Sequence, residues 1–132
     1  MANKLPDAEK LTINIGHVDL GQIDLLVAEG FYSNRTDFIR SAIRQQTALH
    51  ADSLRQTVAR KSLTLGLTHL DAAGLGAAQR SGQKLELRVL GLCHIAADVS
   101  PELARAAIGS ITVLGALNAS PAVKAALADR IR

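Results

Sequence analysis

The chain is organised around residues 10–49, which read KLTINIGHVDLGQIDLLVAEGFYSNRTDFIRSAIRQQTAL. Residues 10–15 alternate polar and apolar side chains with a period of two, which is typical of a half-buried strand. Two helical patterns follow this strand and are separated at Gly30. A lone strand cannot satisfy its own backbone hydrogen-bonding groups. We therefore predict that it pairs with the same strand of a second copy, and that the helices of both copies cover one face of this ribbon.

The alternation assigns the side chains of the strand to two faces of the predicted ribbon. Lys10, Thr12 and Asn14 are expected to point outward, and the apolar residues between them inward. The second helix adds an apolar stripe at helical spacing, which is expected to pack on the inner face. The predicted dimer core comprises Leu11, Ile13, Ile15, Phe38, Ile39, Ala42 and Ile43.

The two helical patterns have recognisable ends. The first helix is predicted to begin near Val18 or Asp19 and to end at Gly30, because glycine suits the left-handed conformation beyond a helix C-terminus. Ser33 is the predicted N-cap of the second helix, because its hydroxyl can accept a hydrogen bond from the first turn. The polar residues 50–62 are either a linker or a helical extension, and a helix with interruptions is favoured. The first helix is expected to bury a stripe of Leu20, Ile23, Leu26 and Val27.

Residues 10–49 resemble the ribbon-helix-helix DNA-binding domain of the MetJ/Arc/CopG type. The resemblance depends on the strand at residues 10–15, the turn at Gly30 and the opening of the second helix at residues 32–40. It does not bear directly on residues 63–132. It implies a homodimer that binds double-stranded DNA through an antiparallel ribbon in the major groove. It also implies base contacts from Lys10, Thr12 and Asn14, and phosphate contacts from Ser33, Asn34 and Arg35.

The residue types at these positions suit such contacts. Lysine can donate to guanine, asparagine can pair with adenine, and threonine can touch a thymine methyl group. A helix N-terminus can hold a phosphate through its free backbone N–H groups. The alternatives are an ordinary solvated strand face and a serine that only caps its helix. Arg40 and Arg44 lie four residues apart, and either a phosphate contact or a solvated helix face is consistent with this spacing.

Composition allows a packed domain but does not by itself indicate nucleic acid. The chain has 132 residues, of which 48% are apolar and only 2% aromatic, so its core must use Leu, Ile, Val and Ala. The net charge is +3, and residues 1–62 carry eight basic against seven acidic side chains. Any DNA-binding surface must therefore come from local clustering of charge rather than from the overall charge.

The sequence carries no sign of export or of membrane insertion. Its single cysteine, Cys93, allows no intrachain disulfide. No apolar run approaches the roughly 18 to 20 residues of a membrane span, and residues 1–10 lack the apolar segment of a signal peptide. We expect a cytoplasmic protein with no membrane partner, and a flexible N-terminal arm at residues 1–9.

Residues 63–132 contain an internal repeat. The pairs Leu65-Gly66, Leu90-Gly91 and Leu114-Gly115 recur at spacings of 25 and 24 residues, each within a strand pattern. These strands are expected at residues 63–67, 85–89 and 111–114. A helix is expected after each, capped by Asp71 (residues 72–79), by Ser100 before Pro101 and by Ser120 before Pro121.

Strands joined through helices are most simply parallel. The predicted fold class is therefore α+β, with an intertwined ribbon-helix-helix dimer followed by a small solenoid-like stack of parallel strands. The open ends of such a stack invite pairing with another copy. The predicted domains are residues 10–49 for DNA binding, 50–62 as a connection and 63–132 for oligomerisation.

The sequence offers little support for a metal, a cofactor or catalysis. The candidate ligands are His17, His50, His69, His94 and Cys93. Cys93 and His94 are adjacent at the end of a predicted strand and should point to opposite faces, while His69 is isolated. No pair has the spacing of a metal site. The glycines around Leu75 lack the rest of a phosphate-binding loop. No catalytic constellation stands out, so we predict neither an enzyme nor a cofactor.

These observations favour a sequence-specific transcriptional regulator, most simply a repressor, whose C-terminal repeat promotes higher oligomers and cooperative binding. Two alternatives stay open. One is an antitoxin that regulates its own operon and binds a toxin through its C-terminal half. The other is a structural protein whose main activity is to form polymers through the repeat.

Overall fold

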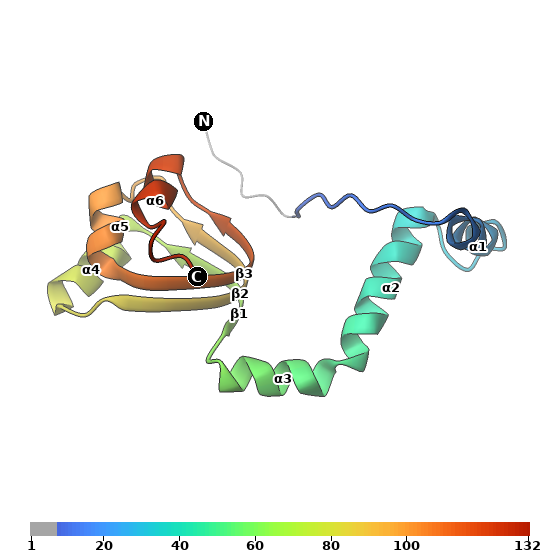
Figure 1. Cartoon of the computed structure of the whole chain (residues 1–132), viewed down its shortest axis with the longest axis horizontal. Coiled ribbons are helices and arrows are strands. Elements are labelled where there is room, and N and C mark those ends of the chain that lie inside the picture. The colour runs from blue at the N-terminus through green and yellow to red at the C-terminus, as the bar shows by residue number, and fades with distance from the viewer. Residues whose placement is uncertain (1–7) are drawn as a thin grey trace. The chain divides into compact units, whose positions relative to one another are not determined.

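The computed structural model describes residues 8–132, and the chain divides into two compact units, Met1–Leu54 and Arg55–Arg132 (Figure 1). The predicted arm at residues 1–9 lies mostly outside the described residues. Among the described residues, no helix is long and apolar enough to cross a membrane. The structure contains both helices and a parallel sheet, which confirms the mixed α+β class.

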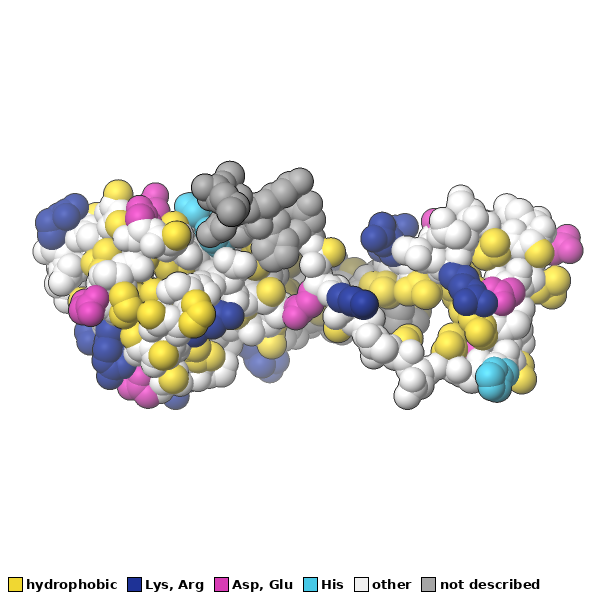
Figure 2. All heavy atoms as spheres, turned by 90° about the horizontal axis from the view of Figure 1, so that it is seen from above, with side chains coloured by type: hydrophobic (Ala, Val, Ile, Leu, Met, Phe, Trp, Pro, Cys, Tyr) yellow, Lys and Arg dark blue, Asp and Glu magenta, His cyan; other side chains and the backbone are white. Residues whose placement is uncertain are grey.

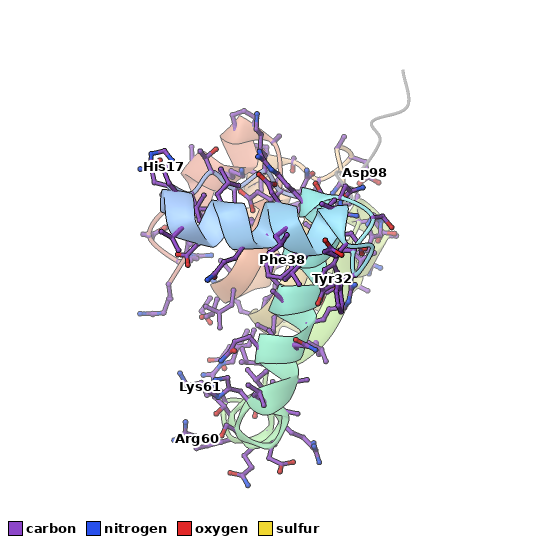
Figure 3. The ribbon with its side chains drawn as sticks, turned by 90° about the vertical axis from the view of Figure 1, so that its right-hand side faces the viewer. His17, Tyr32, Phe38, Arg60, Lys61 and Asp98 are labelled. Carbon is purple, nitrogen blue, oxygen red and sulfur yellow. The ribbon has the colours of Figure 1, made fainter. Side chains whose placement is uncertain are left out.

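The N-terminal unit consists mainly of two helices, α1 (His17–Ala28) and α2 (Arg35–Leu49). Helix α1 begins one residue earlier than the first of the predicted starts. Its apolar stripe faces α2, with Ile23 buried and Leu20, Leu26 and Val27 half-buried. The turn after it contains Gly30 at a φ of 85°, the left-handed conformation expected there. The Tyr32 and Phe38 rings meet edge to face with centroids 5.0 Å apart, where α1 crosses α2 (Figure 3).

The N-cap of α2 is Asn34, so the prediction of Ser33 is wrong. The Asn34 side-chain oxygen accepts from the Asp37 backbone N–H at 2.8 Å, and the Asp37 carboxylate accepts from the Ser33 N–H at 2.9 Å. This reciprocal pair resembles a capping box, except that the acid accepts from the N–H of the residue before the N-cap. Serine and asparagine cap equally well, so only the position of the acid at the third helical residue distinguishes them.

Residues 10–15, the predicted strand, have no regular secondary structure in the single chain and appear as an extended trace leading into α1 (Figure 1). No described segment of the chain pairs with them. A strand exists only where a neighbouring strand accepts and donates its hydrogen bonds. The expected neighbour belongs to a second copy, so the ribbon stays a prediction.

Helix α3 (Ala51–Arg60) follows α2 after the single residue His50. It lies within the predicted connection, residues 50–62. The boundary between the two compact units also falls inside it, after Leu54.

The C-terminal unit contains three parallel strands in the order β1 (Thr64–Leu70), β2 (Leu85–Ile95) and β3 (Ile108–Asn118). The parallel arrangement confirms the prediction, although β2 and β3 are longer than the alternating patterns indicated. The repeated sequence positions are aligned across the sheet. Leu65 pairs with Leu90 and Leu90 with Leu114, and the glycine that follows each of them pairs in the same way.

The aligned glycines form a column across the three strands of the sheet, which Figure 1 shows side by side. Gly66, Gly91 and Gly115 have φ values of 113°, 138° and 121°, a region that side-chain-bearing residues rarely adopt. A Cβ atom on Gly91 would lie 2.3 Å from the Gly66 carbonyl oxygen, and one on Gly115 would lie 2.0 Å from the Gly91 carbonyl oxygen. The close stacking of the strands therefore requires glycine at these two positions.

Helices α4 (Ala72–Ser81), α5 (Pro101–Ala107) and α6 (Pro121–Ala126) pack against one face of the sheet. Their N-caps are Asp71, Ser100 and Ser120, as predicted, and each side chain accepts from a backbone N–H in the first turn. The core between sheet and helices is aliphatic. Its buried members are Leu75, Val89, Cys93, Ile95, Val99, Ala104, Ala107, Ile108, Ile111, Val123 and Leu127.

Candidate nucleic-acid interface

The extended segment before α1 presents both of its predicted faces to solvent. Lys10, Thr12 and Asn14 are exposed. The apolar residues between them are also exposed, at 84% for Leu11, 73% for Ile13 and 43% for Ile15. Three aliphatic side chains at alternate positions of one extended segment are costly to leave in water, since each is worth roughly 1.5–3 kcal/mol when buried.

The helices of the N-terminal unit also lack a core of their own. Ile23, at 6% exposure, is the buried hydrophobic residue of the described part of this unit. Of the predicted dimer core on α2, Phe38 and Ala42 are half-buried, whereas Ile39 and Ile43 are exposed. Figure 2 shows hydrophobic side chains at the surface of this unit, on the right of the view. Its exposed large hydrophobic residues are Leu11, Ile13, Ile15, Val18, Leu25, Phe31, Ile39, Ile43, Leu49 and Leu54.

The N-terminus of α2 lines an open pocket of about 380 Å³ that contains two of the predicted phosphate-contacting residues. The capping box uses the backbone N–H groups of Ser33 and Asp37. Those of Arg35 and Thr36 donate to no acceptor within residues 8–132. The pocket thus combines free backbone donors with two arginines from the following turns. Its lining residues are Ser33, Asn34, Thr36, Asp37, Arg40 and Arg44.

Arg35, the third predicted phosphate contact, is held by a carboxylate of the same unit. Its guanidinium donates to both carboxylate oxygens of Asp24 at 2.8 Å, which ties α2 to α1. These hydrogen bonds lower the pKa of Asp24 and raise that of Arg35. The pair contributes stability above the pKa that Asp24 has in the unfolded chain, and loses it as the pH falls through the lower folded value. Sequence spacing alone did not reveal this pair, because its members lie 11 residues apart on different helices.

Replacing Asn34 by alanine tests the observed cap. We expect Asn34→Ala to destabilise the N-terminal unit by about 1 kcal/mol, because the Asp37 N–H loses its acceptor. Ser33→Ala should cost much less, since only the Ser33 backbone takes part in the cap. Thermal unfolding followed by the fluorescence of Tyr32, the sole tyrosine, measures both variants. Equal losses of stability would contradict the capping arrangement.

The sequence indicated that His69 is isolated, but in the structure it contacts the other histidine of the C-terminal unit, His94. The His69 and His94 rings are aligned on neighbouring strands and stack with centroids 5.0 Å apart. His94 Nδ1 lies 2.9 Å from the Asn118 side-chain oxygen. Cys93 lies buried in the core, and this burial raises the pKa of its thiol. Within residues 8–132, no three His, Cys, Asp or Glu side chains are grouped closely enough to hold a metal ion.

Two parts therefore define this protein: an extended segment with two helices that lack a complete core, and a parallel strand–helix repeat. The chain belongs to the ribbon-helix-helix transcriptional regulator family, whose family model matches residues 6–124. The match extends far beyond residues 10–49, to which the sequence resemblance was confined, and it covers most of the strand–helix repeat. No curated protein and no solved structure matches the chain.

Proposed function

We propose that this protein is a transcriptional repressor that binds operator DNA as a homodimer, through a two-stranded ribbon contributed equally by both copies. The observation that carries the proposal is the row of exposed aliphatic residues Leu11, Ile13 and Ile15 before α1. Pairing two such segments supplies the missing ladder of backbone hydrogen bonds. It also places the exposed stripe of α2 against the inner face of the ribbon, which gives the N-terminal unit a core.

The outward face of the proposed ribbon carries Lys10, Thr12 and Asn14 from each copy. A two-stranded antiparallel ribbon fits the major groove of B-DNA, where these residue types can read base edges. The pocket at the N-terminus of α2 supports a phosphate contact beside the groove, because free backbone N–H groups and the helix dipole both attract an anion. In this arrangement Ser33 contacts the phosphate through its hydroxyl group, because its backbone N–H already donates to Asp37, and Asn34 contacts it through its backbone N–H. Arg35 orients the helix through its pair with Asp24.

Arg40 and Arg44 line the same pocket, which favours a phosphate contact over a purely solvated face. The segment 10–49 then acts as the DNA-binding domain in the cytoplasm, residues 50–62 connect it, and residues 63–132 promote higher oligomers. Linked DNA-binding heads raise the effective concentration of each head at neighbouring half-sites.

Base readout is tested by removing one outward side chain at a time. We expect Asn14→Ala or Lys10→Ala to cost about 1–3 kcal/mol in specific binding and to relax the sequence preference. Selection on random oligonucleotides first gives the preferred site, and footprinting then measures each variant on it. Arg40→Ala serves as the comparison, because loss of a phosphate contact should weaken all sequences equally. Unchanged footprints for Asn14→Ala and Lys10→Ala would exclude the ribbon as the reader.

A further inference from the structure

The two outer strands of the sheet lack the charges and prolines that keep a sheet edge from pairing with another chain, and the register shift of β3, at Gly109, lies before residues 113–118. Strands β1 and β3 contain no Lys, Arg, Asp, Glu or Pro, whereas the central strand β2 contains Glu86 and Arg88. Folded proteins usually place charges, prolines or bulges on edge strands and leave central strands uncharged. The reverse distribution here indicates that both edges are covered in the functional protein.

The exposed leucines of the outer strands also indicate that a neighbouring strand is missing at each edge. Leu65 and Leu67 on β1 are 74% and 60% exposed, and Leu114 on β3 is 51% exposed. Their partners on the central strand, Leu90 and Leu92, point to the same face and are half-buried. The difference arises because the central leucines have a neighbouring strand on each side. A further strand at each edge would cover the outer leucines to the same extent.

The glycine column restricts which strand can continue the sheet. At each existing joint, the carbonyl oxygen of one glycine occupies the position that a Cβ atom on the next glycine would need. Gly66 has the same backbone conformation, with a φ of 113°, but nothing lies within 4 Å of its Cβ position. A strand docked on β1 by the same geometry would place its own glycine carbonyl there. In this chain the glycine that is left for that role is Gly115 of β3.

The free part of β3 matches β1 in position. On the outer side of β3, residues 130–132 pair only with Ile111. The Ile111 N–H donates to the Arg130 carbonyl oxygen, and the Arg132 N–H donates to the Ile111 carbonyl oxygen. Residues 113–118 pair with β2 and, among the described residues, with no other strand. Counted across the sheet, residue 64 of β1 is level with residue 113 of β3. If β1 of a second chain continued the sheet beside β3, its first residue would therefore lie just beyond the part of β3 that residues 130–132 cover.

We propose that the β3 edge of one copy pairs in parallel with the β1 edge of a second copy, with Gly115 opposite Gly66. The register then places Leu114 opposite Leu65 and Ala116 opposite Leu67. The joint repeats the step that already relates β1 to β2 and β2 to β3. Because the two edges are different surfaces, the contact is head to tail, and it generates an open-ended stack rather than a closed pair. This inference rests on the oligomerising role proposed above and specifies its surface.

Two single-cysteine variants of the full-length chain test the joint directly. Neighbouring parallel strands are about 4.8 Å apart, which lies within the Cα separation of a disulfide. Leu67→Cys and Ala116→Cys, mixed without DNA and mildly oxidised, should give a disulfide-linked pair that contains one chain of each kind. Neither variant alone should form one, since the native Cys93 is buried. Ala122→Cys, exposed on α6, is the matched control and should not link to Leu67→Cys.

The outcomes separate the possible arrangements. No mixed disulfide would overturn the joint. Efficient linkage of Leu67→Cys with itself would overturn it in favour of an antiparallel β1–β1 contact. If the protein gave a DNA footprint but no mixed disulfide, the β3–β1 contact would be refuted and the repressor function would stand. If it gave the mixed disulfide but bound no DNA, only the proposed repressor function would be refuted.

Charge placement provides a second test that does not depend on chemistry at cysteine. In one chain, residues 67 and 116 are separated by the central strand, but they are neighbours across the joint. The variant Leu67→Asp with Ala116→Asp should weaken association, and Leu67→Lys with Ala116→Asp should restore it. We expect the concentrations of half-association, measured by light scattering, to differ on the order of tenfold between the two. Equal values would contradict the register.

Discussion

Replacing Ile13 by lysine is expected to abolish both the ribbon dimer and DNA binding, while the single chain keeps its fold. Ile13 is 73% exposed in the single chain, so a lysine there meets water. In the proposed ribbon the same position lies on the inner face beneath the helices. An unpaired charge buried there costs about 3–5 kcal/mol, and the dimer would carry two of them. Sedimentation equilibrium and a DNA mobility-shift assay measure the two losses.

Thr12→Lys is the matched control for this prediction. It introduces the same side chain one residue away, on the face that the ribbon turns toward DNA. We expect Thr12→Lys to keep the ribbon dimer and to change which sequences are bound. If Ile13→Lys bound its operator with wild-type affinity, the assignment of the two faces would be wrong. If both variants lost the dimer equally, residues 10–15 would not form a strand of alternating faces.

Replacing Gly91 by alanine is expected to destabilise the C-terminal unit by about 2–6 kcal/mol. The new methyl group would lie 2.3 Å from the Gly66 carbonyl oxygen, and the backbone has a φ of 138°. Such strain costs about 1–3 kcal/mol, and overpacking against the neighbouring backbone costs a similar amount. Because a domain is stable by only about 5–15 kcal/mol, a large part of its stability would be lost.

Cys93 provides a specific probe for this loss. Its thiol is buried in the core of the C-terminal unit, so it reacts with a thiol reagent only when the unit opens. We expect labelling of Cys93 to be at least tenfold faster in Gly91→Ala. The control is Gly76→Ala in α4, where the added methyl group meets only the end of the Arg80 side chain at 3.3 Å. An alanine inside a helix should stabilise it by about 0.5–1 kcal/mol. Equally fast labelling of both variants would refute the role assigned to the glycine column.

Much of the C-terminal unit was predictable because its signals are local. The Ser-Pro pairs at residues 100 and 120 and Asp71 identified the N-caps of its helices. The alternation of strands and helices predicted parallel strands, because a helix between two strands returns the chain to the end of the sheet where the first strand began. The full length of β2 and β3 was not predictable from alternation, because the adjacent apolar residues Val89-Leu90 and Val113-Leu114 interrupt the period of two inside these strands.

The N-terminal unit was predictable in outline but not in its contacts. The apolar stripe of α1 follows from helical periodicity, whereas the Asp24–Arg35 pair depends on how two helices cross. The sequence predicted Ser33 as the N-cap of α2, whereas the structure has Asn34. Both residue types cap helices well, and the position of Asp37, rather than the intrinsic preference of either residue, selects Asn34.

The sequence by itself determined the order of the elements, the family resemblance at residues 10–49 and the parallel repeat, since each follows from periodicity and from capping residues within a few positions. Only the tertiary structure decided that His69 stacks on His94, that the glycines form one column, and that the uncharged strands β1 and β3 are the edges of the sheet. These facts depend on which strands become neighbours and in what register. Both are set by packing between segments more than twenty residues apart.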